Sequence, residues 1–339
     1  MKLLYINCLN NRGCQEYLQQ LEEHDEVTLD KIILPRDGEH DSVEHLLKDH
    51  LRTIDFQSYD CVFFPARYQA LGIPLRLMRV PFCILWQAWL KGTGAPYVHE
   101  LSNHGYIFTM LMHMARLTDE DLRDAMELRQ ELYLNGLQST DRAIRLYGQL
   151  PMDLPNEYLL VPLEYRLIAD VLPYLTGLIN FSNKHKLPLV IKIHPEFYRP
   201  EKTSNTVGFI KMLAQRCVND VLFYCGNLYE AMHLASFVFV HDKGRILDAA
   251  VTNARAIVPK KSFLSHSQAF LTGGTIEEAV FHAPPREDCF MKQLRLIHFV
   301  HNVLQSLDHA LLSIRDTGPP DILVEEVSQF DETEFAPLV

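Results

Sequence analysis

The segment that most constrains the fold is Leu189–Ile193, a nearly continuous apolar run that is followed by a polar His-Pro-Glu turn. A run of this kind, rich in β-branched residues, is typical of a parallel strand that is covered on both faces. Because proline has no N–H to donate to a central ladder, Pro195 predicts that the strand stops at His194. The segment therefore predicts one strand of a buried parallel sheet, with polar groups at its carboxyl end.

Strand-like and helix-like segments alternate along the whole chain. The strand-like segments are 2–6, 27–34, 61–65, 158–163, 189–193, 221–224, 237–241 and 256–258, and the helix-like segments are 13–23, 41–54, 118–135, 171–185, 206–216, 228–235 and 245–252. Strands that alternate with helices of this length predict parallel, doubly wound sheets. The apolar stretch 77–90 fits either a core helix or a strand followed by a turn, since Pro81 disfavours one unbroken helix.

A polar, proline-containing stretch, Gly148–Glu157, divides this alternation into two halves. We expect an α/β protein with two Rossmann-like domains, each a doubly wound parallel sheet, that face a cleft. The first would span 1–150, and the second 151–312, with a terminal helix that crosses back; residues 313–339 would form an acidic tail. Neither half contains GxGxxG or GxxxxGK[ST], which argues against a dinucleotide fingerprint and a P-loop.

Composition narrows the function classes. The net charge of −11 argues against nucleic acid as a partner, because neutralising phosphates requires a basic face. The 7 cysteines form no CxxC pair, so neither a disulfide framework nor a zinc site is indicated, and we expect a reduced, cytoplasmic setting. No apolar run reaches the roughly 18 residues that a membrane span needs. The segment 77–90, which holds both tryptophans, is interpreted as core, with docking on a membrane or partner as the alternative.

Candidate site residues follow the strand ends of the second half, because ligands bind outside the carboxyl ends of strands in open α/β sheets. Lys192 and His194 stand at one such end, and an ammonium and an imidazole there suit a phosphate oxygen. The alternative is a surface turn without a ligand.

A second strand end leads through Asp242 into Lys243-Gly244-Arg245 and the start of a helix. Helix N-termini bind anions, and the cationic side chains add positive charge. Asp248, one turn into the helix, would accept ribose hydroxyls or simply favour the helix dipole. The alternative is an ordinary capped helix on a basic patch.

Carboxylates near the same edges are the candidate nucleophiles, acids and bases. Glu164 and Asp170 follow the strand 158–163, where a helix cap is the alternative role for Asp170. In the first half, the glycine- and proline-containing stretch 92–105 is interpreted as a loop that faces the cleft. Its Glu100, His99 and His104 are candidate acid or base groups, and a mobile surface loop is the alternative.

The order of these signals resembles the capsule polysaccharide biosynthesis proteins, which include the Kdo (3-deoxy-manno-octulosonic acid) transferases. The family's VPLQ strand end, K-x-HP strand end and NS-x-x-G-x-E-A turn would here be residues 161–164, 192–195 and 242–249. The resemblance covers about 158–260, with a fainter similarity over 96–105. The His-Pro pair is also similar to the motif of bacterial sialyltransferases that binds CMP.

The resemblance implies a GT-B glycosyltransferase that binds a CMP-activated sugar, Kdo or another ulosonic acid, in its C-terminal domain. His194 would contact the donor phosphate, Lys192 would assist and Asp248 would hold the ribose. Glu100 would be the general acid or base, and in retaining members Asp170 or Glu164 would be the nucleophile. No metal or other cofactor is required, because Lys, Arg and His balance the leaving group.

The implied partners are the nucleotide sugar and a glycan or glycolipid acceptor of surface polysaccharide synthesis. The protein would be cytoplasmic, or peripheral at the inner membrane with polysaccharide-assembly partners. Two alternatives stay open. One is a GT-B-like transferase or epimerase with a UDP- or GDP-sugar. The other is a non-catalytic scaffold subunit, since the family's glutamine is Glu164 here and its Asn-Ser is Asp242-Lys243.

Overall fold

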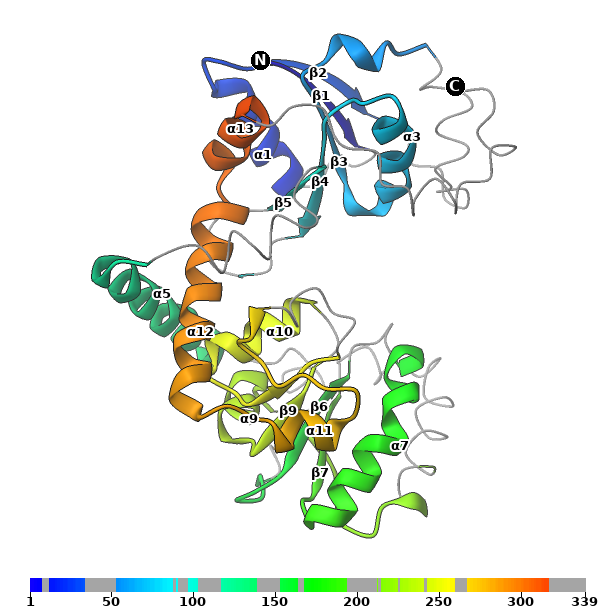
Figure 1. Cartoon of the computed structure of the whole chain (residues 1–339), viewed down its shortest axis with the longest axis vertical. Coiled ribbons are helices and arrows are strands. Elements are labelled where there is room, and N and C mark those ends of the chain that lie inside the picture. The colour runs from blue at the N-terminus through cyan, green and yellow to red at the C-terminus, as the bar shows by residue number, and fades with distance from the viewer. Residues whose placement is uncertain are drawn as a thin grey trace. The chain divides into compact units, whose positions relative to one another are not determined.

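The computed structural model contains two α/β units, and Figure 1 labels most of their helices and strands. Unit 1 contains Met1–Trp89, Gly94–Leu111 and Val300–Val339, and unit 2 contains Leu90–Thr93 and Met112–Phe299. The structure describes residues 1–7, 12–33, 53–87, 90, 97–102, 117–138, 153–163, 168–193, 212, 215–224, 226–240, 243–259 and 267–316. Most of the helices predicted over 41–54 and 206–216, and the segment 317–339, lie outside these residues.

The described part of unit 1 holds a five-stranded sheet in the order β2-β1-β3-β4-β5. Its strands are β1 Lys2–Asn7, β2 Thr28–Ile33, β3 Cys61–Pro65, β4 Phe82–Gln87 and β5 Tyr97–Leu101. The first four are mutually parallel, and β5 pairs antiparallel to β4. The parallel strands confirm the predicted fold class, and the order is that of flavodoxin-like sheets.

The antiparallel strand β5 corrects the loop predicted over 92–105. Tyr97, His99 and Leu101 pair with Gln87, Leu85 and Cys83 of β4. The sequence pattern gave no sign of this short edge strand, because glycine and proline precede it and polar residues follow it. A strand of five residues gives a weak periodic signal, so tertiary pairing decides its conformation.

Two apolar layers cover the faces of this sheet. On one face, Tyr5 and Phe63 pack with Tyr17 of α1 (Arg12–Glu23) and with Leu311 and Ile314 of α13 (Leu307–Asp316). The other face packs against η2 (Phe56–Ser58), η3 (Ala66–Leu71) and α3 (Gly72–Leu77). The apolar stretch 77–90 is thus the end of a helix followed by β4.

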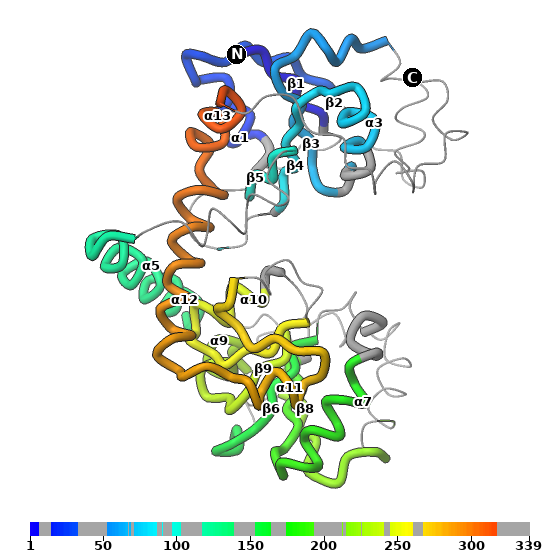
Figure 2. Tube along the Cα trace, viewed as in Figure 1, coloured from blue at the N-terminus to red at the C-terminus, as the bar shows by residue number. Residues whose placement is uncertain are grey.

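The described part of unit 2 holds a second five-stranded sheet, all parallel, in the order β10-β9-β6-β7-β8. Its strands are β6 Leu159–Leu163, β7 Leu189–Ile193, β8 Val221–Tyr224, β9 Phe237–Phe239 and β10 Ala256–Ile257. Numbered along this unit, the order is 5-4-1-2-3, the first five strands of the Rossmann arrangement. The chain therefore reverses its direction across the sheet between β6 and β9. Figure 2 traces the chain through this unit and labels β6, β8 and β9.

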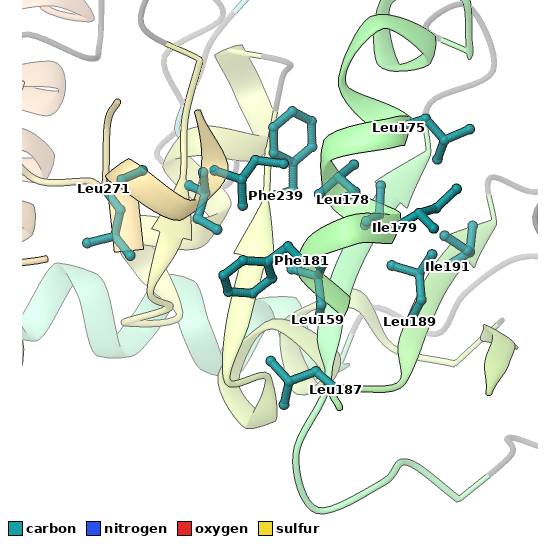
Figure 3. Close-up of a cluster of buried hydrophobic side chains, with 14 of the residues drawn as sticks. Leu159, Leu175, Leu178, Ile179, Phe181, Leu187, Leu189, Ile191, Phe239 and Leu271 are labelled. Atoms are coloured by element: carbon teal, nitrogen blue, oxygen red, sulfur yellow. The ribbon is translucent and has the colours of Figure 1, made fainter. Parts of the chain in front are cut away.

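Helix α7 (Ile168–His185) and helix α11 (Ile276–Phe281) cover one face of this sheet. Leu159, Leu189 and Ile191 of the strands face Leu178 and Phe181 of α7, and all five are buried (Figure 3). Each such side chain contributes on the order of 2 kcal/mol to folding by leaving water. The sheet is therefore fixed by an apolar layer that reaches towards its carboxyl edge through Phe239.

The opposite face of the sheet presents Leu160, Val190 and Val238, which are also buried. Helix α9 reaches this face, where the hydroxyl of Tyr158 donates to the carbonyl of Ala231 at 2.7 Å. The remaining described helices of the unit are α5 Asp119–Gln138, α9 Leu228–Leu234, α10 Lys243–Val251 and α12 Arg286–Phe299.

Two boundaries differ from those expected. Helix α5 lies in unit 2 and not in the first half, because it packs against α12 and because Asn227 bonds to its last carbonyls. The single terminal helix expected at the end of the second domain is three elements, namely α12, the π-helical turn η7 Val300–Leu304 and α13. With η7 the chain returns to unit 1.

Candidate functional site

The candidate site lies at the carboxyl edge of the unit 2 sheet. At this edge the chain leaves the neighbouring strands β6 and β9 towards opposite sides of the sheet. In open α/β sheets, a crevice for ligands forms outside the carboxyl ends of the strands at such a switch point. Here the point lies between β6 and β9. The strand β7, which carries Lys192, adjoins β6, and α10 begins four residues after β9.

Lys192 is a buried lysine, only 7% exposed, near the carboxyl end of β7. In register beside it lie Pro162 of β6 and Tyr224 of β8. The Tyr224 hydroxyl donates to Glu230 of α9 at 3.2 Å. Water screens charges only weakly at a buried position, so the ammonium of Lys192 interacts strongly with charged groups close to it.

Helix α10 begins at Lys243, two residues earlier than predicted. In its first turn, the Arg245 guanidinium forms an ion pair with Asp248, with Nη1 2.8 Å from Oδ2. The Tyr229 hydroxyl donates to the other oxygen, Oδ1, at 2.8 Å. Asp248 is 3% exposed, so the carboxylate that the resemblance assigned to the ribose has donors from the protein on both oxygens.

Tyr229, which the sequence analysis missed, is the second contact of Asp248. Burial raises the pKa of its hydroxyl above the usual value, and the negative charge of Asp248 adds to the effect. Its ring lies so close to Gly136 of α5 that a Cβ there would be 2.3 Å from Cδ1. Tyr229 is thus held by packing as well as by its hydrogen bond.

Asn227, also missed, joins the same two helices. Its Oδ1 accepts from the N–H groups of Tyr229 and Glu230 at 2.8 and 3.2 Å and so caps α9. Its Nδ2 donates to the carbonyls of Gly136 and Leu137 at 2.9 and 3.1 Å, at the end of α5. An asparagine directly before a helix-like segment is an N-cap signal that would have found the first of these roles.

Glu100 and His99 lie on β5 of unit 1 and differ sharply. Glu100 is exposed, and its carboxylate accepts from Nε1 of Trp86. His99 is buried between the Tyr17 hydroxyl, 2.8 Å from Nε2, and the Leu304 carbonyl, 2.9 Å from Nδ1. Burial lowers the pKa of His99 to about 4. His99 is therefore a neutral core histidine and not the candidate acid or base that the sequence suggested.

The other predicted residues are only partly covered. Glu164, His194, Asp242 and His104 lie outside the described residues. Asp170 belongs to α7, and Lys243 and Gly244 to α10, and only their backbones are described. Of the predicted side chains, the structure thus brings Lys192, Arg245 and Asp248 into unit 2, at or near one sheet edge, while Glu100 belongs to unit 1.

A cavity of about 220 Å³ opens at the carboxyl ends of β9 and β10. It is lined mainly by apolar atoms, with Tyr174 of α7, Phe239 of β9 and Ile276 of α11 among its walls, and the backbone of Gly273 and Gly274 along its side. It lies on the α7 side of the sheet. The described residues bring together no group of three His, Cys, Asp or Glu side chains able to hold a metal ion.

No family model matches the chain, and no curated protein matches it. Similar solved structures include the β-Kdo 2,4-transferase KpsC of Thermosulfurimonas dismutans, 12% identical, with a TM-score of 0.46 over 85% of this chain and 89% of that one. The UDP-GlcNAc 2-epimerase of Neisseria meningitidis is 11% identical, with a TM-score of 0.44 over 92% and 100%. The glycosyltransferase SnogD of Streptomyces nogalater is 12% identical, with a TM-score of 0.36 over 92% and 99%.

The strand orders of the two sheets define the fold. Among the described helices, none has the length and apolar character that crossing a membrane would require.

Proposed function

We propose that the protein is a GT-B-type glycosyltransferase that transfers a sugar from a nucleotide-activated donor bound at the carboxyl edge of the unit 2 sheet. The observation that carries the proposal is the placement of two cationic side chains about one switch point. Buried Lys192 lies on the β6–β7 side, and Arg245 lies on the helix that follows β9. A GT-B-type enzyme consists of two Rossmann-like domains, and the two α/β units of this chain agree with that architecture.

The chemistry of the edge suits a departing phosphate. Glycosyl transfer from a nucleotide sugar builds negative charge on the leaving diphosphate or monophosphate, and preorganised cations and N–H groups stabilise that charge. The N-terminus of α10 directs backbone N–H groups and a partial positive charge to the same edge, and Arg245 lies in its first turn. Lys192, Arg245 and this helix end together can balance the leaving group.

The donor is proposed to be CMP-linked, with Kdo or another ulosonic acid as the sugar, and the acceptor a glycan or glycolipid of surface polysaccharide synthesis. The support is the order of motifs over 161–164, 192–195 and 242–249. His194 would contact the donor phosphate, and Lys243 and Gly244 would contribute from the turn. Glu100 as general acid or base, and Asp170 or Glu164 as nucleophile, stay predictions.

The second candidate is an enzyme of the same architecture, a transferase or epimerase, that uses a UDP- or GDP-sugar. The all-parallel Rossmann order of unit 2 suits any nucleotide, so it favours no base. The third is a scaffold subunit without turnover, whose support is the altered motif at Asp242-Lys243. The identity of the nucleotide that binds distinguishes the second candidate from the first. Whether the nucleotide sugar is consumed distinguishes the third candidate from the first.

The test is calorimetric titration of the full chain with CMP, UDP and GDP, repeated with Lys192→Met. The matched control is Lys184→Met, which removes an exposed lysine of the same unit that pairs with Glu277 at 2.7 Å. We expect CMP binding that Lys192→Met weakens at least about tenfold and Lys184→Met leaves unchanged, as loss of a charge-assisted phosphate contact requires. Selective UDP or GDP binding would establish the second candidate, and no binding to any of the three would overturn the donor site.

A further inference from the structure

We propose that Asp248 and Tyr229 are positioning residues for Arg245, and that Asp248 does not bind the ribose of the nucleotide. In this arrangement Arg245 contacts the anionic group of the ligand. Asp248 fixes the plane of its guanidinium, and Tyr229 fixes Asp248. The inference rests on the proposed function, because the anion is the phosphate of a nucleotide sugar.

The contacts of the carboxylate carry the first step. Its Oδ2 lies 2.8 Å from Nη1 of Arg245, and its Oδ1 accepts from the Tyr229 hydroxyl at 2.8 Å. The side chain is 4% exposed, whereas that of Arg245 is 22% exposed. Because the side chain is almost fully buried, a ribose hydroxyl has little access to the lone pairs that these two donors leave on Asp248. The group of the pair that reaches solvent is the guanidinium.

The second step is the use of a fixed guanidinium. An arginine side chain has large rotamer freedom, and part of its contribution to binding is lost if that freedom is frozen only when the ligand arrives. An ion pair one turn along the same helix removes the freedom beforehand. The planar fork of Arg245 is thereby held in one orientation in the first turn of α10, which follows the carboxyl end of β9.

The third step concerns what fixes Tyr229 in turn. Its ring packs against Gly136, where even a methyl group would lie 2.3 Å from Cδ1. Its backbone N–H donates to Asn227, whose side chain also bonds to the last turn of α5. A rigid series of contacts thus runs from α5 through α9 to α10. Its last member, Arg245, lies in the first turn of α10, the helix that follows the carboxyl end of β9.

The experiment compares two Tyr→Phe variants of the full chain by calorimetric titration with CMP, or with UDP or GDP if wild type selects one of those. Tyr229→Phe removes the hydroxyl that holds Asp248 and changes no charge. Tyr158→Phe is the matched control, because its buried hydroxyl donates to a backbone carbonyl of the same helix α9. We expect about three- to tenfold weaker binding for Tyr229→Phe and less than about twofold for Tyr158→Phe, at similar losses of thermal stability.

A double-mutant cycle tests whether Tyr229 acts through Arg245. In an Arg245→Ala background, Tyr229→Phe should have no further effect on the dissociation constant. Equal effects in both backgrounds would overturn the inference and leave the proposed function standing. Absence of nucleotide binding by wild type would overturn the proposed function and the inference with it.

The ribose is tested directly with CMP and its 2′,3′-dideoxy analogue on wild type and Asp248→Asn. If Asp248 only positions Arg245, the preference for CMP over the analogue is the same in both proteins, and both ligands bind more weakly to the variant. A preference that disappears in Asp248→Asn would show that the carboxylate holds the ribose. A variant that binds both ligands more tightly would show that Asp248 merely neutralises Arg245.

Discussion

His99 in unit 1 and Asp248 in unit 2 are alike in burial and in their contact with a tyrosine, but they differ in their second partner. Each is 3% exposed, and each is hydrogen-bonded to a tyrosine hydroxyl at 2.8 Å. The second contact of His99 is the carbonyl of Leu304, which can only accept, so Nδ1 carries the proton and Nε2 accepts from Tyr17. The second contact of Asp248 is the guanidinium of Arg245. The hydrogen bonds of His99 thus end at a backbone carbonyl, whereas those of Asp248 end at a cationic side chain near a sheet edge.

The difference shows how to separate structural from functional buried polar groups. A neutral group whose donors and acceptors are all satisfied inside the fold stabilises that fold and has no chemistry to offer a ligand. A buried charge costs free energy to desolvate, so its retention beside another charge invites a functional explanation. The two units therefore differ in what removal of their buried groups should do. Trp86 lies on β4 of unit 1, so its fluorescence follows that unit, while circular dichroism follows both units.

The largest expected effect is the pH dependence of His99. Its pKa is about 4 in the folded protein against the usual 6.5, so the unfolded state takes up a proton between these values and the folded state does not. The contribution of His99 to the free energy of unfolding should fall by about 3 kcal/mol as the pH drops from above 6.5 to about 4, and that contribution should change little below pH 4. Urea unfolding followed by tryptophan fluorescence measures this.

The control for this prediction is His99→Gln, which keeps one donor and one acceptor and does not titrate. The stability difference between wild type and His99→Gln should shrink as the pH falls from 7.5 to 4.5. A difference independent of pH would show that His99 is not held neutral, and the comparison with Asp248 would lose its basis.

The next effect is that of Asp248→Asn on the stability of unit 2. The change leaves Arg245 without its counter-charge and weakens a buried hydrogen bond, so we expect a loss of about 2 kcal/mol. Urea unfolding should show this loss by circular dichroism, with the fluorescence transition of unit 1 unchanged. An unchanged circular dichroism transition would mean that the pair adds nothing to the fold.

Gly136→Ala should reverse the usual sign of a glycine replacement in a helix. Alanine normally stabilises a helix interior by about 1 kcal/mol, but here the new methyl overlaps the Tyr229 ring, and we expect a net loss of about 1 to 2 kcal/mol. Gly177→Ala in α7 is the matched control, since its methyl would meet only the Cδ1 atom of Ile276 at 3.3 Å. A gain in the thermal unfolding temperature for Gly136→Ala would contradict the close packing of α5 on α9.

The smallest loss of stability is expected when the tyrosine hydroxyl that contacts His99 is removed. Tyr17→Phe leaves the Nε2 atom of His99 buried without a donor and should cost about 1 kcal/mol of stability, similar to Tyr229→Phe. Only Tyr229→Phe should change nucleotide affinity. If Tyr17→Phe weakened nucleotide binding as much, then the two tyrosines would be equally remote supports, and Asp248 would lose its special role.

Sequence alone predicted several of the strands well. The segments 189–193 and 221–224 are strands with the predicted bounds. A short continuous apolar run that is followed by a polar turn is compatible with few structures other than a buried strand. Helix α11 was missed although Thr275 and Glu278 form a capping signature, in which the Thr275 hydroxyl accepts from the N–H of Glu278 at 3.1 Å. Its six residues are too few for a helical period to stand out.

Of the candidate site, the sequence predicted only its location at the carboxyl edge of the sheet. Strand ends identified Lys192 and Arg245, because parallel strands bring their carboxyl ends together. The role of Asp248 depends on Tyr229, which is 19 residues away and has no pattern that links the two. Likewise His99 looked like a cleft residue until Tyr17, 82 residues distant, was placed beside it. Contacts at such separations are set by packing, and spacing does not encode them.

The composition of the unit 1 core has a consequence for how the chain is made. Leu3 and Tyr5 of β1 pack in one layer with Leu311 and Ile314 of α13. A ribosome delivers β1 long before α13, whereas unit 2 is complete at Phe299. During synthesis the second unit can therefore fold first, while one face of the first unit's sheet is covered by α1 but not yet by α13. An N-terminal half expressed alone would keep part of that face exposed, so it should aggregate unless α13 is supplied as a separate peptide.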